Sequence, residues 1–437
     1  MYSFDRKEYE RRIGWFTDAR FGMFIHFGLY SIPARGEWLR SDERVEAEDY
    51  EPYIEEFTAE GFDAGHIVRL AKAAGMKYAV LTTKHHDGFC LFDSAHTDFT
   101  SMKAPCHRDL TREFVEACRQ EGIRVGLYYS LIDWHHPDYP HMGDELHPMR
   151  GRKDHADEGR CWSRYLEYMH AQVRELMTAY GRIDMLFLDY SYGDMRGEKW
   201  DAAHLVDMVR TLQPGIVINN RLEVGGTGYG SLVTDSPLPW HGDYVTPEQI
   251  IPPDGIRDSA GRPVAWESCV TMNRHWGYHA QDLFYKSPRA LVRKLVECVS
   301  KGGNMILNIS PDGHGRIPKE QEDTLREIGR WMESNGASIY GCTMAGLPKP
   351  EYGRFTRRGD RLYFHILDDA LGAVPIQGVD RRRIAGIRDL AHGNVVPVAT
   401  HFTYADYPDV VFADLGPDPR VIDGIDHVLE IRLKDDI

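Results

Sequence analysis

Polar side chains suited to hydrogen bonding or acid–base chemistry follow several short apolar runs of this chain. They are His26, His85, His86, Tyr128, Asp189, Arg221, Glu267 and Asn308. Asp189 comes directly after the apolar residues 185–188. A carboxylate in such surroundings has to be paired, capped or catalytic, because burying it alone is costly. We therefore expect Asp189 to be a catalytic residue.

The histidines allow two interpretations. His26, His85 and His86 are candidate metal ligands, because imidazoles suit zinc or iron. However, adjacent residues of a strand point to opposite faces, and neither the His-x-His nor the His-Glu-x-x-His spacing occurs in the chain. Hydrogen bonding to sugar hydroxyl groups, beside aromatic side chains, suits the imidazoles better. We predict no metal ion and no organic cofactor, and keep a metal-dependent barrel hydrolase as the alternative.

Seven near-continuously apolar runs, typical of strands buried on both faces of a parallel sheet, position these residues. They are residues 23–27, 78–83, 124–130, 184–189, 215–219, 263–267 and 304–309, and residues 231–245 have room for an eighth strand. Helical patterns lie between most of these runs; three begin after the capping residues Asp63, Asp109 and Ser287. This alternation predicts an α/β fold with a (β/α)8-like barrel, with a doubly wound sheet as the alternative. Active sites of such barrels form at the carboxyl ends of the strands, where the polar residues stand.

The pattern changes after residue 340. Short alternating runs with Gly, Pro and Asp turns, and no helix-length pattern, predict strands at 361–367, 384–389, 395–402 and 427–433. We predict two domains, a catalytic barrel over residues 1–344 and a small β-sandwich over residues 345–437.

Charge and composition exclude several classes of function. The 67 acidic residues outnumber the 52 basic ones, for a net charge of −15, which argues against a nucleic-acid binder and against adhesion to anionic membranes. No apolar stretch approaches the roughly 20 residues that span a bilayer, and the first ten residues do not resemble a secretory signal. The seven scattered cysteines lack a Cys-x-x-Cys pair and fit reduced thiols, so we expect a cytoplasmic protein. Its oligomeric state is left open.

Several motifs, in order from about residue 15 to 342, resemble the α-L-fucosidases of glycoside hydrolase family 29. They are Phe24-Ile-His26-Phe-Gly28, Gly36-Glu37-Trp38, Lys84-His85-His86-Asp87-Gly88-Phe89, Gly126-Leu-Tyr128-Tyr-Ser130, Trp266-Glu267-Ser-Cys269, Trp276-Gly277-Tyr278 and Gly303-Asn-Met-Ile-Leu-Asn308. The Lys-His-His-Asp-Gly-Phe segment is the most specific of these motifs. The resemblance implies removal of terminal α-L-fucosyl residues from a fucosylated oligosaccharide or glycoconjugate by a retaining mechanism, in a barrel followed by a β-sandwich.

The resemblance also assigns residues. A retaining glycosidase needs a nucleophilic carboxylate and a second carboxyl group as acid/base, and the family's nucleophile corresponds to Asp189. The family's sugar-binding positions correspond to His26, Glu37, Trp38, His85, His86, Tyr128, Arg221 and Trp276. The acid/base lies on a variable loop of the family; Glu248 is the first choice, Glu267 the second, and Asp243 and Asp235 follow.

Two positions depart from the family pattern. Phe27 stands where Trp is frequent, and Tyr190 follows the nucleophile where Gly is frequent. Tyr190 is expected to narrow the pocket or to change what surrounds the sugar. The same mechanism on a related sugar, such as an α-L-galactoside, therefore stays open. So does a catalytically inactive sugar-binding protein, although retention of Asp189 together with a second carboxylate argues against it.

Overall fold

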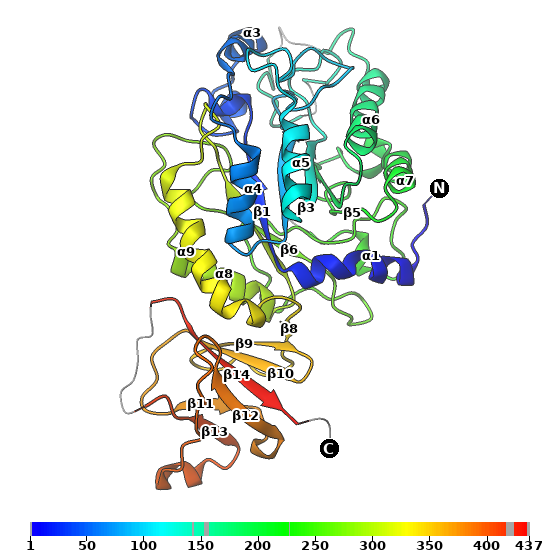
Figure 1. Cartoon of the computed structure of the whole chain (residues 1–437). Coiled ribbons are helices and arrows are strands. Elements are labelled where there is room, and N and C mark those ends of the chain that lie inside the picture. Colours follow the sequence, from blue (N-terminus) through cyan, green and yellow to red (C-terminus); the bar gives the residue numbers. More distant parts are fainter. Residues whose placement is uncertain (1, 142–143, 153–156, 227, 417–423, 435–437) are drawn as a thin grey trace.

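Seven parallel strands form the sheet of the larger part of the molecule in this computed structural model (Figure 1). The structure describes residues 2–141, 144–152, 157–226, 228–416 and 424–434. The strands are β1 (Phe21–Ile25), β2 (Tyr78–Lys84), β3 (Arg124–Ser130), β4 (Met185–Asp189), β5 (Val217–Ile218), β6 (Glu267–Thr271) and β7 (Asn304–Ile309). Their order is β5-β4-β3-β2-β1-β7-β6, and nearly every side chain in them is buried, as their apolar composition predicts.

The sheet closes through the region where the sequence left room for an eighth strand. Its two edge strands are β5 and β6. Asn219, just after β5, forms a parallel bridge with Tyr244, and Val245 forms one with Trp266. A further parallel bridge joins Glu248 to Cys269 of β6. The segment around residues 244–248 therefore lies between the two edges and completes a (β/α)8-like barrel.

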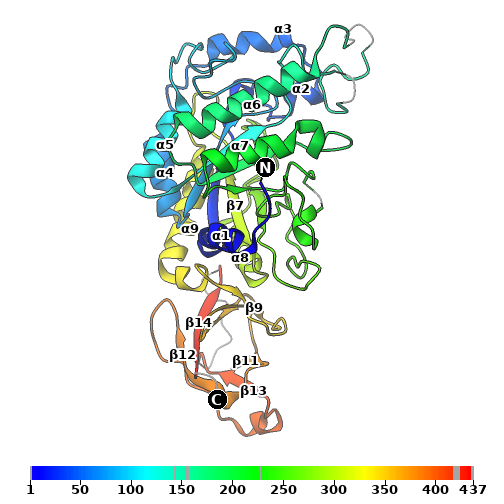
Figure 2. The same cartoon turned by 90° about the vertical axis from the view of Figure 1, so that its right-hand side faces the viewer.

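Helices cover the outside of the barrel (Figures 1 and 2). They are α1 (Arg6–Ala19), α4 (Ala64–Ala73), α5 (Leu110–Glu121), α6 (Trp162–Ala179), α7 (Ala202–Leu212), α8 (Pro288–Ser300) and α9 (Lys319–Asn335), with the short α2 (Leu39–Asp42) and α3 (Ala47–Tyr50) in the connection after β1. The predicted caps are confirmed, because the side chains of Asp63, Asp109 and Ser287 each accept a hydrogen bond from a backbone N–H of the first turn.

The predicted bounds of the sixth strand are wrong. The prediction ended this strand at Glu267, whereas β6 begins there and pairs Glu267 with Asn304, the first residue of β7. The apolar residues 264–266 suggested a strand interior, but they form only an isolated bridge before β6. Glu267 consequently lies at the amino-terminal end of the barrel strands, opposite the rim where we expected it.

Two antiparallel sheets form the smaller, carboxyl-terminal part. One contains β8 (Thr343–Met344), β9 (Gly353–Arg358), β10 (Arg361–Ile366), β12 (Ile384–Asp389) and β14 (His427–Leu433), and the other contains β11 (Val374–Gln377) and β13 (Val410–Ala413). A separate apolar core lies among them, as expected for a β-sandwich. The strand predicted at 395–402 is wrong: Pro397 cannot donate to a sheet ladder, and these residues form only isolated bridges. The division at residue 344 stays a prediction, since β8 pairs with β9 from just before it.

The smaller part lies toward the amino-terminal ends of the barrel strands (Figures 1 and 2). Lys301, which precedes β7, and Met344 of β8 line the same groove. The barrel helix α9 is tied to this part through Trp331, whose indole N–H donates to Asp426 over 2.6 Å. None of the described helices is long and apolar enough to cross a membrane, and the seven cysteines are all free.

Candidate active site

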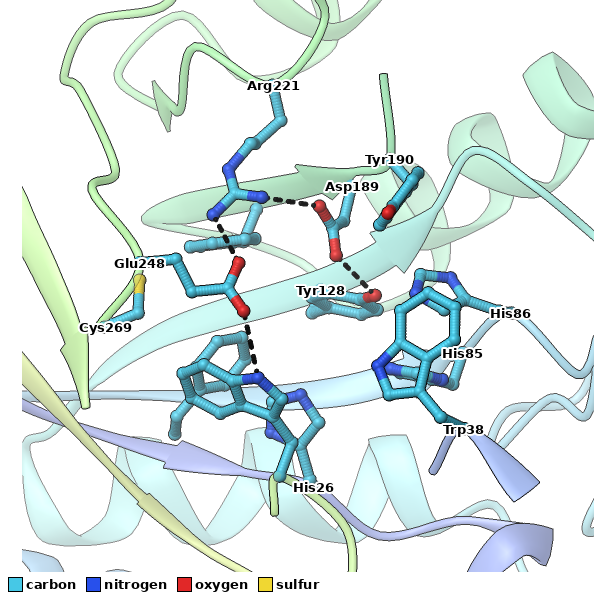
Figure 3. A pocket seen from close by; sticks show the side chains of 13 residues that line it. His26, Trp38, His85, His86, Tyr128, Asp189, Tyr190, Arg221, Glu248 and Cys269 are labelled. Carbon is cyan, nitrogen blue, oxygen red and sulfur yellow. Dashed lines mark hydrogen bonds and ion pairs between the residues drawn. The ribbon is translucent and has the colours of Figure 1, made fainter. Parts of the chain in front are cut away.

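Most of the polar residues that follow the strands meet in one pocket at the carboxyl-terminal rim of the barrel (Figure 3). This is the rim where (β/α)8 barrels carry their active sites. The lining residues of the pocket are Phe24, His26, Trp38, His85, His86, Tyr128, Phe187, Asp189, Tyr190, Arg221, Glu248, Cys269 and Trp276.

Among the predicted catalytic and sugar-binding residues, Glu37, Glu267 and the lower-ranked acid/base candidates Asp243 and Asp235 are not in this lining, and all the others are. Phe24, Phe187 and Cys269 line it without having been predicted. Phe24 and Phe187 stand two positions before His26 and Asp189, and side chains two apart on a strand share a face. Strand alternation was therefore a signal that could have identified them. Cys269 was hidden by the wrong bounds of the sixth strand.

A buried turn after β2 presents His85 and His86. The Lys84 ammonium lies 3.0 Å from the Asp133 carboxylate, and both side chains are buried. Asp87 accepts a hydrogen bond from the Tyr50 hydroxyl over 2.7 Å. Gly88 has φ = +86°, and a Cβ at this position would lie 2.3 Å from Asp133 Oδ1. The turn therefore requires glycine, and the paired charges around it hold both imidazoles in place.

Asp189, the last residue of β4, is the buried carboxylate of the pocket. Its Oδ1 accepts a hydrogen bond from Arg221 Nη1 over 3.0 Å, and its Oδ2 accepts one from the Tyr128 hydroxyl over 3.0 Å. Burial raises the pKa of Asp189 to about 6, although the Arg221 charge and the two hydrogen bonds oppose the increase. The carboxylate is thus held by two donors and is ionised at neutral pH.

Glu248 is the second carboxyl group of the pocket, and it shares the Arg221 guanidinium with Asp189. Arg221 Nη2 donates to Glu248 Oε2 over 3.2 Å, and Trp276 Nε1 donates to Oε1 over 3.1 Å (Figure 3). Its side chain is 38% exposed, against 15% for Asp189. A Cβ at Gly226 would lie 3.1 Å from Glu248 Oε2, so this glycine leaves room for the carboxyl group.

Activity is expected to fall as the pH decreases through about 6. A nucleophilic or electrostatic role requires ionised Asp189, and burial raises the pKa of this group to about 6. Removing the opposing charge in Arg221→Met should raise this pKa further, so the acid limb should move to higher pH. The measurement is kcat/KM against pH for both proteins. A limb near the ordinary pKa of an aspartate, about 4, would contradict the assignment.

The three imidazoles of the pocket are neutral. Burial lowers the pKa of His26 to about 3 and lowers those of His85 and His86 well below the ordinary value. Within the described part of the chain, the buried His85 Nδ1 has no hydrogen-bond partner. A buried polar atom without a hydrogen-bond partner is costly. We therefore expect His85 Nδ1 to form a hydrogen bond with a polar group of the ligand.

Aromatic side chains form the wall beside His86. Tyr190 packs edge-on against the rings of Trp38 and His86, at centroid distances of 5.8 and 5.2 Å. Figure 3 shows Tyr190, Trp38 and His86 on the side of the pocket opposite Glu248. Tyr190 therefore lines the pocket, as expected from its place beside Asp189.

Glu37 is not among the residues that line the pocket. It is buried, and its Oε2 accepts a hydrogen bond from the Gly277 backbone N–H over 2.7 Å. This bond joins the segment carrying Trp38 to the segment carrying Trp276. The structure thus places Glu37 where it joins the two segments that carry these aromatic side chains, and its predicted contact with the sugar stays a prediction.

The structure does not bring Glu267 to the pocket. Its side chain is fully buried at the amino-terminal end of β6, where the Tyr78 hydroxyl donates to Oε2. Oε1 has no hydrogen-bond partner among the described residues. Burial raises the pKa of Glu267 to about 8. The second choice for the acid/base was therefore misplaced, because the strand that carries it begins at this residue.

Glu267→Gln is expected to stabilise the protein near pH 8 while leaving kcat nearly unchanged. The pKa of Glu267 is about 8 in the folded protein and 4.5 ordinarily. Its contribution to stability is therefore complete below about 4.5 and is lost as the pH rises toward 8. Glutamine does not ionise, so the variant should gain on the order of a few kcal/mol near pH 8. Denaturant unfolding of both proteins at acidic and alkaline pH measures this difference, and a large loss of kcat would return Glu267 to the active site.

No group of three or more His, Cys, Asp or Glu residues is arranged to hold a metal ion in the part of the chain that the structure describes. His26 and His86 instead direct one ring nitrogen each to Asn308 and Ser130, over 2.6 and 2.7 Å. The imidazoles thus fit hydrogen bonding better than ligation of a metal.

Comparison with known proteins connects this pocket to a family. The model of the α-L-fucosidase family matches residues 2–337. The plasma α-L-fucosidase of Rattus norvegicus is 32% identical over 350 residues, which cover 75% of this chain and 70% of the rat protein.

Solved structures agree over nearly the whole chain. α-L-Fucosidase isoenzyme 1 from Paenibacillus thiaminolyticus is 52% identical, with a TM-score of 0.95 over 98% of this chain and 100% of the other. A family 29 α-L-fucosidase from Bacteroides thetaiotaomicron is 28% identical, with a TM-score of 0.83 over 99% of this chain and 98% of the other. That structure holds a trapped covalent intermediate, obtained with 2-fluoro-fucosyl fluoride in a glutamate-to-glutamine variant.

Proposed function

This chain belongs to the α-L-fucosidase family, glycoside hydrolase family 29, and we propose that Asp189 and Glu248 are the two carboxyl groups with which it hydrolyses α-L-fucosides. It is a retaining glycoside hydrolase. The observation that carries the assignment of the two residues is the Arg221 guanidinium, which contacts Asp189 and Glu248 at once, over 3.0 and 3.2 Å. No other pair of carboxyl groups lines the described pocket.

The first step forms a bond between Asp189 and the anomeric carbon and breaks the glycosidic bond. Glu248 gives its proton to the departing oxygen, so the aglycone leaves as a neutral alcohol. In the second step Glu248 takes a proton from water, whose oxygen attacks the anomeric carbon and releases Asp189. Two inversions give overall retention of configuration.

Arg221 stays beside one negative charge throughout this cycle. The mechanism places the charge on Asp189 before reaction, since the acid/base has to carry a proton in order to give it to the departing oxygen. In the glycosyl-enzyme Asp189 is an ester, and the charge is on Glu248. Since the guanidinium donates to both groups, it stabilises each charged form without moving, as preorganised electrostatic catalysis requires.

The difference in solvent exposure between Asp189 and Glu248 supports their assignment as nucleophile and acid/base. Asp189 is the more buried group and receives hydrogen bonds on both oxygens, which holds it at a fixed position beside the sugar. Glu248 is more exposed, so water and the departing group have access to it. We propose a fucosylated oligosaccharide or glycoconjugate as the substrate. A cytoplasmic location also stays a proposal, which the seven free thiols support.

The test is hydrolysis of a nitrophenyl α-L-fucoside by the full chain, with the anomer of the first product followed by NMR. We expect release that is insensitive to a chelator, with the α-anomer appearing first. The matched α-L-galactoside differs by a hydroxyl group at the sixth carbon, and it should be a poorer substrate. Appearance of the β-anomer first, or loss of activity with the chelator, would contradict the proposal.

A further inference from the structure

Asn308 fixes the protonation of the His26 ring. The Asn308 side-chain Nδ2 donates to the backbone carbonyl of Trp276 over 2.7 Å. A carbonyl can only accept, so the amide nitrogen must face Trp276 and the amide oxygen must face His26. That oxygen lies 2.6 Å from His26 Nδ1. His26 Nδ1 therefore carries the proton, and Nε2 of this neutral ring carries a lone pair.

Ser130 fixes the protonation of the His86 ring through its hydroxyl group. The Ser130 hydroxyl donates its one hydrogen to the carbonyl of Ile132 over 2.8 Å. Its oxygen lies 2.7 Å from His86 Nδ1 and can only accept from it. His86 Nδ1 is therefore protonated, and its Nε2 also has a lone pair to offer. Ser130, Asn308 and both histidines are buried.

His85 provides the contrast within the same pocket. Its buried Nδ1 has no hydrogen-bond partner in the described part of the chain. The fold therefore does not fix the tautomer of His85 through Nδ1, although its ring lies 4.1 Å from that of His86. The protein thus fixes the tautomer of two of the three pocket imidazoles, so that Nε2 of each is a hydrogen-bond acceptor. A ligand can determine the tautomer of the third, His85.

We propose that Asn308 and Ser130 are positioning residues that hold His26 and His86 as hydrogen-bond acceptors, so that the pocket requires donating hydroxyl groups on the sugar. This inference deepens the proposed function and rests on it for the identity of the ligand. A hydroxyl group that faces either Nε2 has to donate its hydrogen. A substituent that only accepts, such as fluorine, leaves the lone pair unpaired and is rejected, because a buried unsatisfied acceptor is costly.

The tautomers are measurable without any substrate. In the full chain labelled with nitrogen-15 histidine, a long-range proton–nitrogen correlation spectrum at neutral pH distinguishes protonated from unprotonated ring nitrogens. Loss of signals in His26→Gln and His86→Gln assigns the two rings. We expect a protonated Nδ1 and an unprotonated Nε2 in both. A protonated Nε2 in either ring of the unmodified protein would overturn the proposal.

Ser130→Ala should release His86 alone into a mixture of tautomers, and Ser130→Thr, which keeps the hydroxyl group, should preserve the original state. The functional readout is kcat/KM for nitrophenyl fucosides that carry fluorine in place of one hydroxyl, at the third and fourth ring carbons in turn. We expect the unmodified protein to reject at least one of them by about tenfold or more. The ratio of kcat/KM for the unsubstituted fucoside to kcat/KM for the fluorinated one should be smaller in Ser130→Ala than in the unmodified protein. In Ser130→Thr it should equal that of the unmodified protein.

The outcomes separate the two proposals. An unchanged ratio in Ser130→Ala, or an unchanged His86 spectrum, would show that Ser130 does not set the tautomer. Failure of the unmodified protein to hydrolyse any aryl fucoside would instead contradict the proposed function, while the spectrum of the free protein would still report on the two rings.

Discussion

Asp189→Asn is expected to lower kcat/KM for aryl fucosides by at least about 10⁴-fold, because the variant lacks the group that forms the glycosyl-enzyme. Asparagine keeps the size of the side chain; its one amide oxygen can accept from Arg221, and its amide nitrogen can donate to the Tyr128 hydroxyl, which both donates and accepts. The loss should therefore be chemical, with the fold intact. Steady-state kinetics together with thermal unfolding measures both quantities.

Asp184→Asn is the matched control, because Asp184 lies just before the same strand, at its opposite end. Its carboxylate pairs with Arg124 over 2.8 Å, far from the pocket lining. This variant should lose little activity. If Asp189→Asn retained more than about a hundredth of kcat, the loss would be smaller than acid/base catalysis alone typically supplies, and the nucleophile would have to be another residue.

Glu248→Ala is expected to reduce kcat by about 10²- to 10⁴-fold on substrates with poor leaving groups, the range typical of a lost general acid/base. On an activated aryl fucoside the first step needs little protonation, so the glycosyl-enzyme should still form. Its hydrolysis should then be slow, because no base activates the water. Added azide needs no base and should restore turnover, giving a fucosyl azide of retained configuration.

Glu267→Ala serves as the comparison for the rescue experiment. Glu267 lies at the opposite end of the barrel from the pocket, so azide should not accelerate this variant. Rescue of the Glu267 variant alone would reverse the order of the two candidates. Rescue of neither would leave Glu248 as a residue that only binds, which contradicts the proposed mechanism.

Much of the barrel was predictable because its strands are buried on both faces and its helices begin at capping side chains. The third strand (124–130) and the seventh (304–309) have the predicted bounds, and Asp63, Asp109 and Ser287 cap as expected. The eighth strand gave no periodic pattern because it is reduced to isolated bridges around residues 244–248. The sandwich strand 395–402 was wrong because Pro397 prevents continuous pairing.

The site residues were predictable where the residue type and its sequence neighbours indicate the chemistry. They were less predictable where the role of a residue depends on contacts with distant parts of the chain. Asp189 after an apolar strand and the adjacent imidazoles were evident from the chain itself. The contribution of Glu37 was different, since its partner, the Gly277 amide, is 240 residues away. The position of Glu267 was predicted wrongly. The Tyr78 hydroxyl, whose hydrogen bond allows a buried carboxyl group at this place in a strand, is distant in the sequence, so the residues around Glu267 do not reveal this bond.

Trapping the glycosyl-enzyme tests the central claim most directly. Incubation of the full chain with 2-fluoro-fucosyl fluoride, the compound used with the Bacteroides thetaiotaomicron enzyme, should slow the second step and accumulate the covalent intermediate. Mass spectrometry of the intact protein and of its peptides then locates the sugar. We predict one fluoro-fucosyl group per chain, attached to Asp189. An adduct on Glu248 or on any other residue, or turnover with inversion and no adduct, would contradict the account.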